Sequence, residues 1–192
     1  MKILHKTLAD YKSMPWKNGG GTTLEMAISP EGATLGDGDF LWRVSSADVS
    51  TGGPFSLFPE HDRLLFLLSG GGMILSGEGR QLSLGRPLWA ERFRGDIPYE
   101  CTLPLGPLKD FNVIWRRDAF ECTFRELHPD GQEFLPLEGD ITIFFAPSGI
   151  SEACCDLLRT MDLVIAEDYS PGEKVPIGGI GNPLLVFTLE KI

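Results

Sequence analysis

The chain has 192 residues, of which 42% are hydrophobic, enough for a packed core in one large domain or two small, closely fused ones. Its 27 acidic and 17 basic residues give a formal net charge of −10, which disfavours non-specific binding to nucleic acid or to an anionic membrane surface. The 23 glycines and 14 prolines exclude long helices and are typical of short strands joined by turns.

The N-terminal stretch is polar enough to suggest a cytoplasmic protein. Residues Met1–His5 contain no apolar leader, and no apolar run approaches the ~20 residues of a membrane span. The first predicted strand, Thr22–Ser29, alternates in hydrophobicity. Strict alternation would place Thr23, Glu25 and Ala27 on one face and the larger apolar side chains on the other.

Further short strands are predicted through the first half of the chain. Residues Arg63–Leu68 form an almost continuous apolar run after the arginine, which is typical of a strand covered on both faces. The alternating segment Phe111–Arg116 should turn Asn112 away from its apolar neighbours. The other strands predicted in this half are Phe40–Ser46, Met73–Leu75, Gln81–Leu84, Pro87–Phe93 and Pro98–Leu103.

The second half repeats this pattern, with predicted strands at Asp140–Ala146, Asp162–Glu167 and Leu184–Glu190. Residues Ser151–Met161 fit either a short helix or a buried strand. A polar stretch with proline and glycine, Asp118–Pro136, interrupts the strands. We therefore expect an all-β protein of sandwich or barrel type, with residues 1–118 in one unit and 119–192 in a smaller, closely fused one.

Several chemical motifs are missing from the sequence. The three histidines, His5, His61 and His128, are far apart and form no metal-binding pattern, so no metal is expected. There is no Walker or dinucleotide-binding glycine pattern and no nucleophile-elbow motif. The four cysteines include no C-x-x-C pair, and reduced thiols are expected. No cofactor is predicted.

One glycine-rich segment, Met14–Thr22, is dense in recognition chemistry. It places the aromatic plane of Trp16, the ammonium of Lys17 and the amide of Asn18 directly before three glycines. Glycines let backbone N–H groups approach a ligand and can form an anion-binding concavity. The alternative is a glycine-rich turn packed under the tryptophan.

Polar side chains also lie on strands that are otherwise apolar. Arg43 and Ser45 share one face of their strand, Arg63 begins the next long strand, and Asn112 lies between apolar neighbours. Arginine suits bidentate binding of a carboxylate, and in an acidic protein such a ligand needs a local cationic pocket. The alternative is structural, with Arg63 paired to an acidic side chain such as Asp62, Asp96 or Glu25.

These motifs, in their order, resemble the HutD/Ves family of cupin-like proteins over about residues 14–117. The segments that carry the resemblance are Pro15–Thr22 with Glu25, Trp42–Ser45, Gly53–Pro59, Asp62-Arg63, Leu67–Gly72, Phe93–Asp96, Asp110–Val113 and Arg116-Arg117. The resemblance implies a bicupin-like antiparallel β-barrel or sandwich. It also implies a role in histidine utilisation, through a small acidic metabolite of the urocanate or formylglutamate class, or in stress response. Glu60-His61 departs from relatives, which tend to have glycine at the first of these positions.

The leading hypothesis is a non-enzymatic protein that binds a small carboxylate without a metal. A tryptophan would wall the ligand, cationic side chains would hold its carboxylate, and amides would orient it. The residues expected to form this site are Trp16, Lys17, Asn18, Gly19, Gly20, Gly21, Thr22, Glu25, Arg43, Ser45, Arg63, Asp96 and Asn112.

Two alternatives remain open. One is a metal-independent isomerase or hydrolase of cupin type, with Glu25 or Asp96 as general base near Arg63 or Lys17. The other is an interaction module without a small ligand, which acts through a sheet face. A homodimer is possible under either hypothesis.

Overall fold

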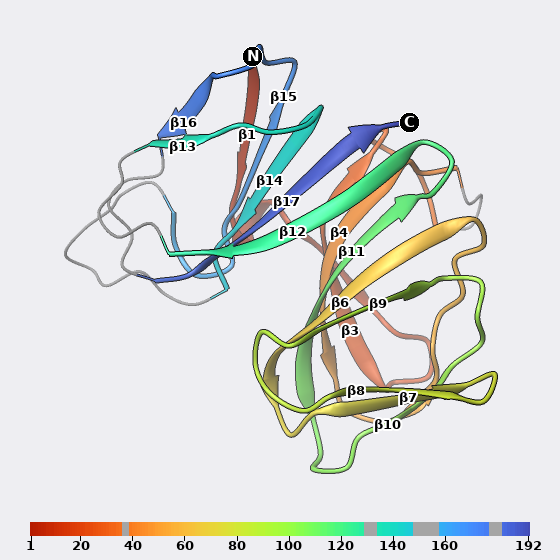
Figure 1. The fold of residues 1–192 in the computed structure, drawn as a ribbon. Helices are drawn as coiled ribbons and strands as arrows, with labels where there is room; N and C mark the ends of the chain where they lie inside the picture. Colours follow the sequence, from red (N-terminus) through yellow and green to blue (C-terminus); the bar gives the residue numbers. More distant parts are fainter. Residues whose placement is uncertain (36–38, 129–133, 148–157, 177–181) are drawn as a thin grey trace. The chain divides into compact units, whose positions relative to one another are not determined.

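The strands are antiparallel throughout the part of the chain that the computed structural model describes, residues 1–35, 39–128, 134–147, 158–176 and 182–192. Within these residues the helical structure is a single 3-10 turn, η1 (Leu8–Asp10). The prediction of an all-β antiparallel protein with little helix is confirmed (Figure 1).

The chain divides into two compact units. The larger unit is Tyr11–Ala119, and the smaller unit combines Met1–Asp10 with Phe120–Ile192. This grouping differs from the expected division, 1–118 and 119–192, at the N-terminus. The first strand, β1 (Lys2–Lys6), pairs with β15 (Leu163–Glu167) and therefore groups with the second half of the chain.

Two sheets form the larger unit. The six-stranded sheet has, in spatial order, β2 (Lys12–Pro15), β3 (Gly21–Ser29), β4 (Trp42–Val49), β11 (Leu108–Arg116), β6 (His61–Gly70) and β9 (Ala90–Arg94). The four-stranded sheet has, in spatial order, β5 (Gly53–Pro54), β10 (Glu100–Thr102), β7 (Met73–Gly77) and β8 (Arg80–Leu84). Figure 1 shows β7, β8 and β10 running across the long strands of the six-stranded sheet.

A hydrophobic core fills the space between these two sheets. Leu65 and Leu67 of β6 meet Met73 and Leu75 of β7, all at most 2% exposed. The predicted apolar run of β6 is therefore covered on both faces, because Leu64 and Phe66, on its other side, are also buried. Toward the start of β6, Arg63 takes the position on this face that Leu65 and Leu67 occupy further along the strand.

The alternation predicted for β3 is wrong beyond Glu25. Glu25 lies opposite Ser45 of β4, but Ala27 lies opposite Val44, because the register shifts at a β-bulge between them. Cross-strand partners share a face, so Ala27 turns away from the face that carries Thr23 and Glu25. The bulge inserts Met26, which is buried.

The smaller unit has a five-stranded and a two-stranded sheet. The five-stranded sheet has, in spatial order, β1, β15, β14 (Ile141–Phe145), β17 (Leu184–Lys191) and β12 (Phe120–Leu127), and β13 (Phe134–Pro136) pairs with β16 (Lys174–Pro176). Its core includes Phe144, Val164 and Val186. The expected interruption at Asp118–Pro136 is wrong, because that stretch contains the eight-residue strand β12. Ser151–Met161 lies largely outside the described residues.

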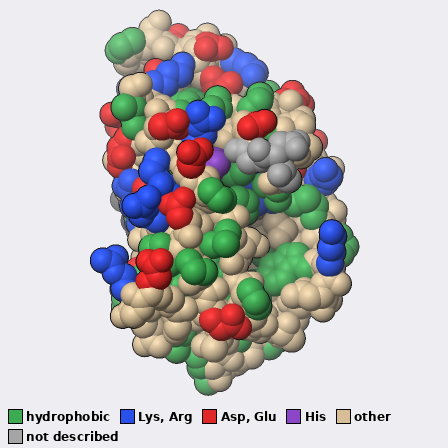
Figure 2. All heavy atoms as spheres, turned by 90° about the vertical axis from the view of Figure 1, so that its right-hand side faces the viewer, with side chains coloured by type: hydrophobic (Ala, Val, Ile, Leu, Met, Phe, Trp, Pro, Cys, Tyr) green, Lys and Arg blue, Asp and Glu red, His purple; other side chains and the backbone are tan. Residues whose placement is uncertain are grey.

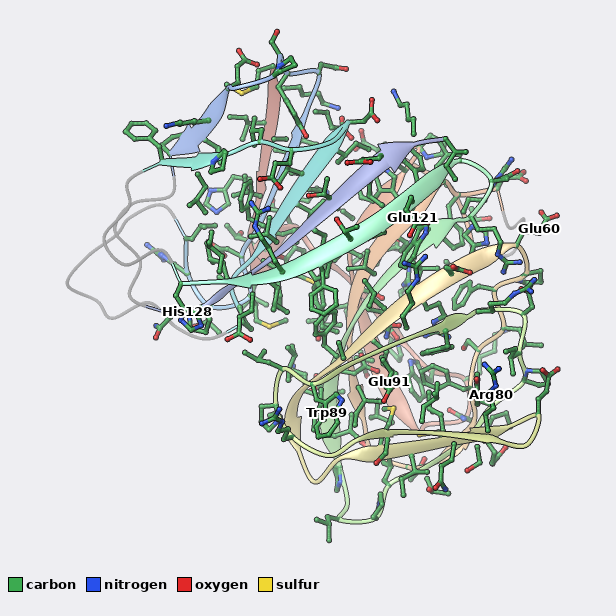
Figure 3. All side chains as sticks on the ribbon, in the orientation of Figure 1. Glu60, Arg80, Trp89, Glu91, Glu121 and His128 are labelled. Carbon is green, nitrogen blue, oxygen red and sulfur yellow. The ribbon has the colours of Figure 1, made fainter. Side chains whose placement is uncertain are left out.

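A strained residue precedes β6. Glu60 has a φ of 63°, in the left-handed region that favours glycine. Its backbone N–H donates to Asp96 Oδ1 at 2.7 Å. The side chain lies at the outer end of β6 (Figure 3). The positive φ explains why glycine is expected at this position in relatives. In this chain the hydrogen bond to Asp96 helps to hold the turn.

Candidate functional site

Four polar side chains from three different strands meet on one face of the six-stranded sheet. β11 lies between β4 and β6, and Asn112 of β11 faces Ser45 across the first pair. Two positions along, Ile114 lies opposite Arg43 on one side and Arg63 on the other. Since residues two apart share a face, both arginines project on the same side of the sheet.

This face borders a cavity of about 620 Å³ in the larger unit. Its polar and charged lining side chains are Lys17, Asn18, Thr23, Arg43, Ser45, Thr51, Ser56, Arg63, Cys101, Asp110 and Asn112, and its apolar ones include Met14, Trp16, Leu35, Phe55, Phe58 and Ile114. Figure 2 shows a recess beside hydrophobic side chains, with a cationic side chain close by. A volume of this size is typical of a site for a small molecule.

Arg43 is held by an acidic side chain of the neighbouring strand. Its Nε donates to Glu25 Oε2 at 2.9 Å, and Nη1 donates to Ser45 Oγ at 3.1 Å. The Arg43 side chain is only 4% exposed and that of Glu25 only 12%. Burial lowers the pKa of Arg43, and the Glu25 carboxylate opposes that change. Arg43 thus has a counterion within the protein.

Arg63 forms no salt bridge with any of the described residues, although the charge of Asp110 acts on it through space. Nη1 donates to the carbonyl oxygen of Ser56 and Nη2 to Asn112 Oδ1, both at 2.9 Å, so these hydrogen bonds end on neutral oxygens. The guanidinium lies 4.4 Å from the ring centre of Phe55 and 5.1 Å from that of Phe58. Such aromatic contacts favour a buried cation without neutralising it.

The two guanidinium groups also act on each other. Burial and the nearby charge of Arg43 together lower the pKa of Arg63 to about 9, although the charge of Asp110 raises it. Arg63 is still a cation at neutral pH. Within the described residues, Arg43 Nη2 and Arg63 Nε are buried nitrogens without a hydrogen-bond partner. An anion bound beside both groups would offset their repulsion and supply acceptors.

Asp110 is the buried acid of the cavity. Its Oδ1 accepts a hydrogen bond from the backbone N–H of Ala47 at 2.9 Å. Burial raises the pKa of this carboxyl to about 7, although Ala47, Arg63 and the Asn112 side chain each lower it. The carboxyl is therefore close to half protonated at neutral pH.

The predicted glycine loop uses its backbone groups within its own turn. Asn18 Oδ1 accepts the N–H of Gly20 at 3.0 Å, and the Gly19 N–H donates to the carbonyl oxygen of Trp16 at 3.0 Å. Trp16 donates from Nε1 to Thr23 Oγ1 at 2.8 Å and lines the cavity beside Gly21, where a Cβ would lie 3.1 Å from the indole. The turn thus positions Trp16 as a wall of the cavity.

The structure brings together about half of the expected site residues. Those that line the cavity are Trp16, Lys17, Asn18, Arg43, Ser45, Arg63 and Asn112. Those absent from its lining are Gly19, Gly20, Gly21, Thr22, Glu25 and Asp96. Glu25 lies behind the cavity wall, where it accepts a hydrogen bond from Arg43. Asp96 instead accepts hydrogen bonds from Glu60, Arg94 and Arg117. Arg63 pairs with none of the three acids considered for it.

Sequence reasoning missed Asp110, Cys101 and the two phenylalanines that flank Arg63. A pattern for Asp110 was present, because it precedes Asn112 by two positions and so shares its face. Cys101 comes from the opposite sheet, and no sequence pattern connects it to this face. Burial raises its pKa to about 11, so its thiol is protonated at neutral pH.

The described residues contain no group of three or more His, Cys, Asp or Glu side chains that could hold a metal ion. The ring nitrogens of buried His61 lie 2.6 Å and 2.9 Å from the carbonyl oxygens of Pro59 and Phe40. Cys101 and Cys122 are free thiols, while Cys154 and Cys155 lie outside the described residues. No helix in the described ranges is long and apolar enough to cross a membrane.

The Glu25–Arg43 pair gives a first testable expectation. Glu25→Gln should lower the free energy of unfolding by about 3 kcal/mol, because it leaves Arg43 buried without a counterion. Urea unfolding at neutral pH measures the change. The control is Asp48→Asn, which breaks the exposed Lys109–Asp48 pair and should cost less than about 0.5 kcal/mol. Equal losses in the two variants would contradict the structural role of Glu25.

Comparisons with known proteins are consistent with this architecture. The family model described as HutD matches residues 8–170. The 21.2 kDa protein in the hutC 3′ region of Pseudomonas putida is 36% identical over 140 residues, which cover 72% of this chain and 70% of that protein. Protein Ves of Citrobacter koseri is 34% identical over 120 residues, 60% of this chain and 61% of its own length.

Solved structures show the same fold over the whole chain. HutD from Pseudomonas fluorescens SBW25, described as a formate condition, has a TM-score of 0.80 at 28% identity, with 100% of both chains covered. A nickel(II) complex of the bacterial pirin YhhW from Escherichia coli has a TM-score of 0.65 at 10% identity, again with 100% of both chains covered. The latter likeness concerns the fold alone.

Proposed function

The chain belongs to the HutD family, and we propose that it is a binding protein for a small carboxylate held in the cavity of the larger unit. The observation that carries this proposal is the Arg63 guanidinium, a buried cation at the cavity wall whose hydrogen bonds go to neutral oxygens. A buried charge without a counterion is costly, and a ligand carboxylate is the group that a guanidinium binds best.

The remaining walls favour a ligand with an apolar or flat body. Trp16, Phe55, Phe58 and Ile114 line the cavity around the arginines. Asn18 and Asn112 add amide groups that can orient polar atoms of a ligand. The proposed ligand thus places its carboxylate toward Arg63 and its less polar part toward the aromatic side chains.

We further propose that the ligand is an acidic metabolite of histidine utilisation, of the urocanate or formylglutamate class, and that the protein modulates that pathway. The family's name and the position of the Pseudomonas putida relative in the hutC 3′ region support this link.

The two residues considered as general base do not support the enzyme alternative. The residues considered as its general base, Glu25 and Asp96, both bind arginine side chains and are not part of the cavity lining. The protonated thiol of Cys101 is a poor nucleophile. A non-enzymatic binding role therefore remains the proposal.

Isothermal calorimetry with urocanate, N-formylglutamate, formate and histidine tests the proposed function. We expect saturable binding of at least one of the three carboxylates without an amino group, and weaker binding of histidine. Two or three charge-assisted contacts, each about 1.5–3 kcal/mol, support affinities near the micromolar range after entropic costs. Failure of all three to bind at millimolar concentration would show that the ligand class is wrong.

A further inference from the structure

Asp110 is a cavity acid that neither the ligand hypothesis nor the ion pairs already described explain. It lies on β11 at the cavity wall, 3% exposed, on the same face as Asn112. The side chain of Asn112 bridges it to Arg63, since Asn112 accepts from Arg63 and hydrogen-bonds to the Asp110 carboxyl. An acid and a buried cation thus share one amide at the site where a carboxylate is proposed to bind.

The surroundings of Asp110 decide how it responds to an anion. The charged and titratable groups around it are Glu25 of β3, Arg43 and Asp48 of β4, Arg63 of β6, Cys101 of β10 and Lys17 of the loop between β2 and β3. Glu25 already neutralises Arg43, and Lys17 is exposed. Arg63 is therefore the cation for which Asp110 and an incoming carboxylate compete.

We infer that Asp110 is a recognition residue of this cavity that is protonated whenever a carboxylate occupies it, so that binding takes up one proton from solvent. The inference rests on the proposed function and adds the protonation state of the site. Two carboxylates beside one guanidinium cannot both stay ionised at low cost, and the buried one takes the proton. As a neutral acid, Asp110 then donates an O–H where its ionised form would repel the ligand.

The sign of the pH dependence follows directly. In the free protein the carboxyl titrates near pH 7, and a bound anion raises its pKa further. Below that range Asp110 is already protonated and binding changes no proton. Above it, each binding event takes up close to one proton, and affinity should be about tenfold weaker at pH 8 than at pH 6. An amino acid whose ammonium pairs with ionised Asp110 would show the opposite trend.

Calorimetry in two buffers of different ionisation enthalpy measures the proton count. Suitable probes are formate, N-formylglutamate and cinnamate. Cinnamate is an unsaturated planar acid whose ring does not titrate between pH 6 and pH 8. We expect uptake of close to one proton at pH 8 and close to none at pH 6 in the unmodified protein. In Asp110→Asn, uptake should vanish and affinity should no longer depend on pH. The control Asp118→Asn, on an exposed carboxylate that pairs with Arg116, should behave as the unmodified protein does.

The outcomes separate the two proposals. Carboxylate binding without proton uptake at either pH, or uptake that persists in Asp110→Asn, overturns the inference and leaves the proposed function standing. Absence of binding by all three probes at pH 6 overturns both. Should Asp110→Asn fail to fold, the carbon-13 shift of the Asp110 carboxyl in the unmodified protein decides. This chemical shift must move from the value of an ionised carboxylate to that of a protonated carboxyl when the probe is added at pH 8.

Discussion

Arg63→Met is expected to weaken carboxylate binding by about 100-fold, the largest effect of any single change in the cavity. Methionine keeps an unbranched stem beside Phe55, Phe58 and Phe93, so the packing around the side chain is largely retained. What is removed is the cation that the ligand carboxylate needs. Calorimetry with the strongest-binding carboxylate measures the loss.

Two further variants make this expectation specific. Arg63→Lys keeps the charge but loses the planar fork and should recover only part of the affinity. Arg94→Met removes an exposed arginine of the adjacent strand β9 and should leave affinity unchanged. An affinity within a few-fold of the unmodified protein in Arg63→Met would mean that the carboxylate is held elsewhere.

The strands that build this site follow from local sequence patterns. The apolar run after Arg63 and the alternation around Asn112 are sufficient to predict β6 and β11, and the two polar residues on them line the cavity. What local patterns do not contain is the strand order. Only because β11 lies between β4 and β6 do Arg43, Asn112 and Arg63 meet. Such pairing is non-local and is set by packing of whole sheets.

Two other failures have local physical causes. The bulge in β3 places Glu25 and Ala27 on opposite faces of the sheet. A strict two-residue alternation cannot predict such an inserted residue. Asp110 was omitted because an acidic residue at a predicted strand edge is ordinarily solvated. In the structure β11 begins three residues before the predicted Phe111, at Leu108, which carries Asp110 inside the sheet.

The same burial makes Asp110 a source of pH-dependent stability. Its pKa is raised from 3.8 to about 7, so between these values the folded state binds more protons than the unfolded state. Stability contributed by this group is therefore complete at low pH and lost as pH rises toward 7. The full loss is about 4 kcal/mol, of which about 2.5 kcal/mol falls between pH 5 and pH 8.

Urea unfolding of the ligand-free protein at pH 5 and pH 8 measures this loss against Asp110→Asn. Because asparagine does not titrate, the variant should gain about 2.5 kcal/mol relative to the unmodified protein across that interval. Asp96 has a lowered pKa and contributes in the opposite sense below this range, but it is present in both proteins and cancels in the comparison. Parallel pH profiles for the two proteins would mean that Asp110 is ionised at pH 5 in the folded state. Any proton taken up on binding would then have to bind to a group other than Asp110.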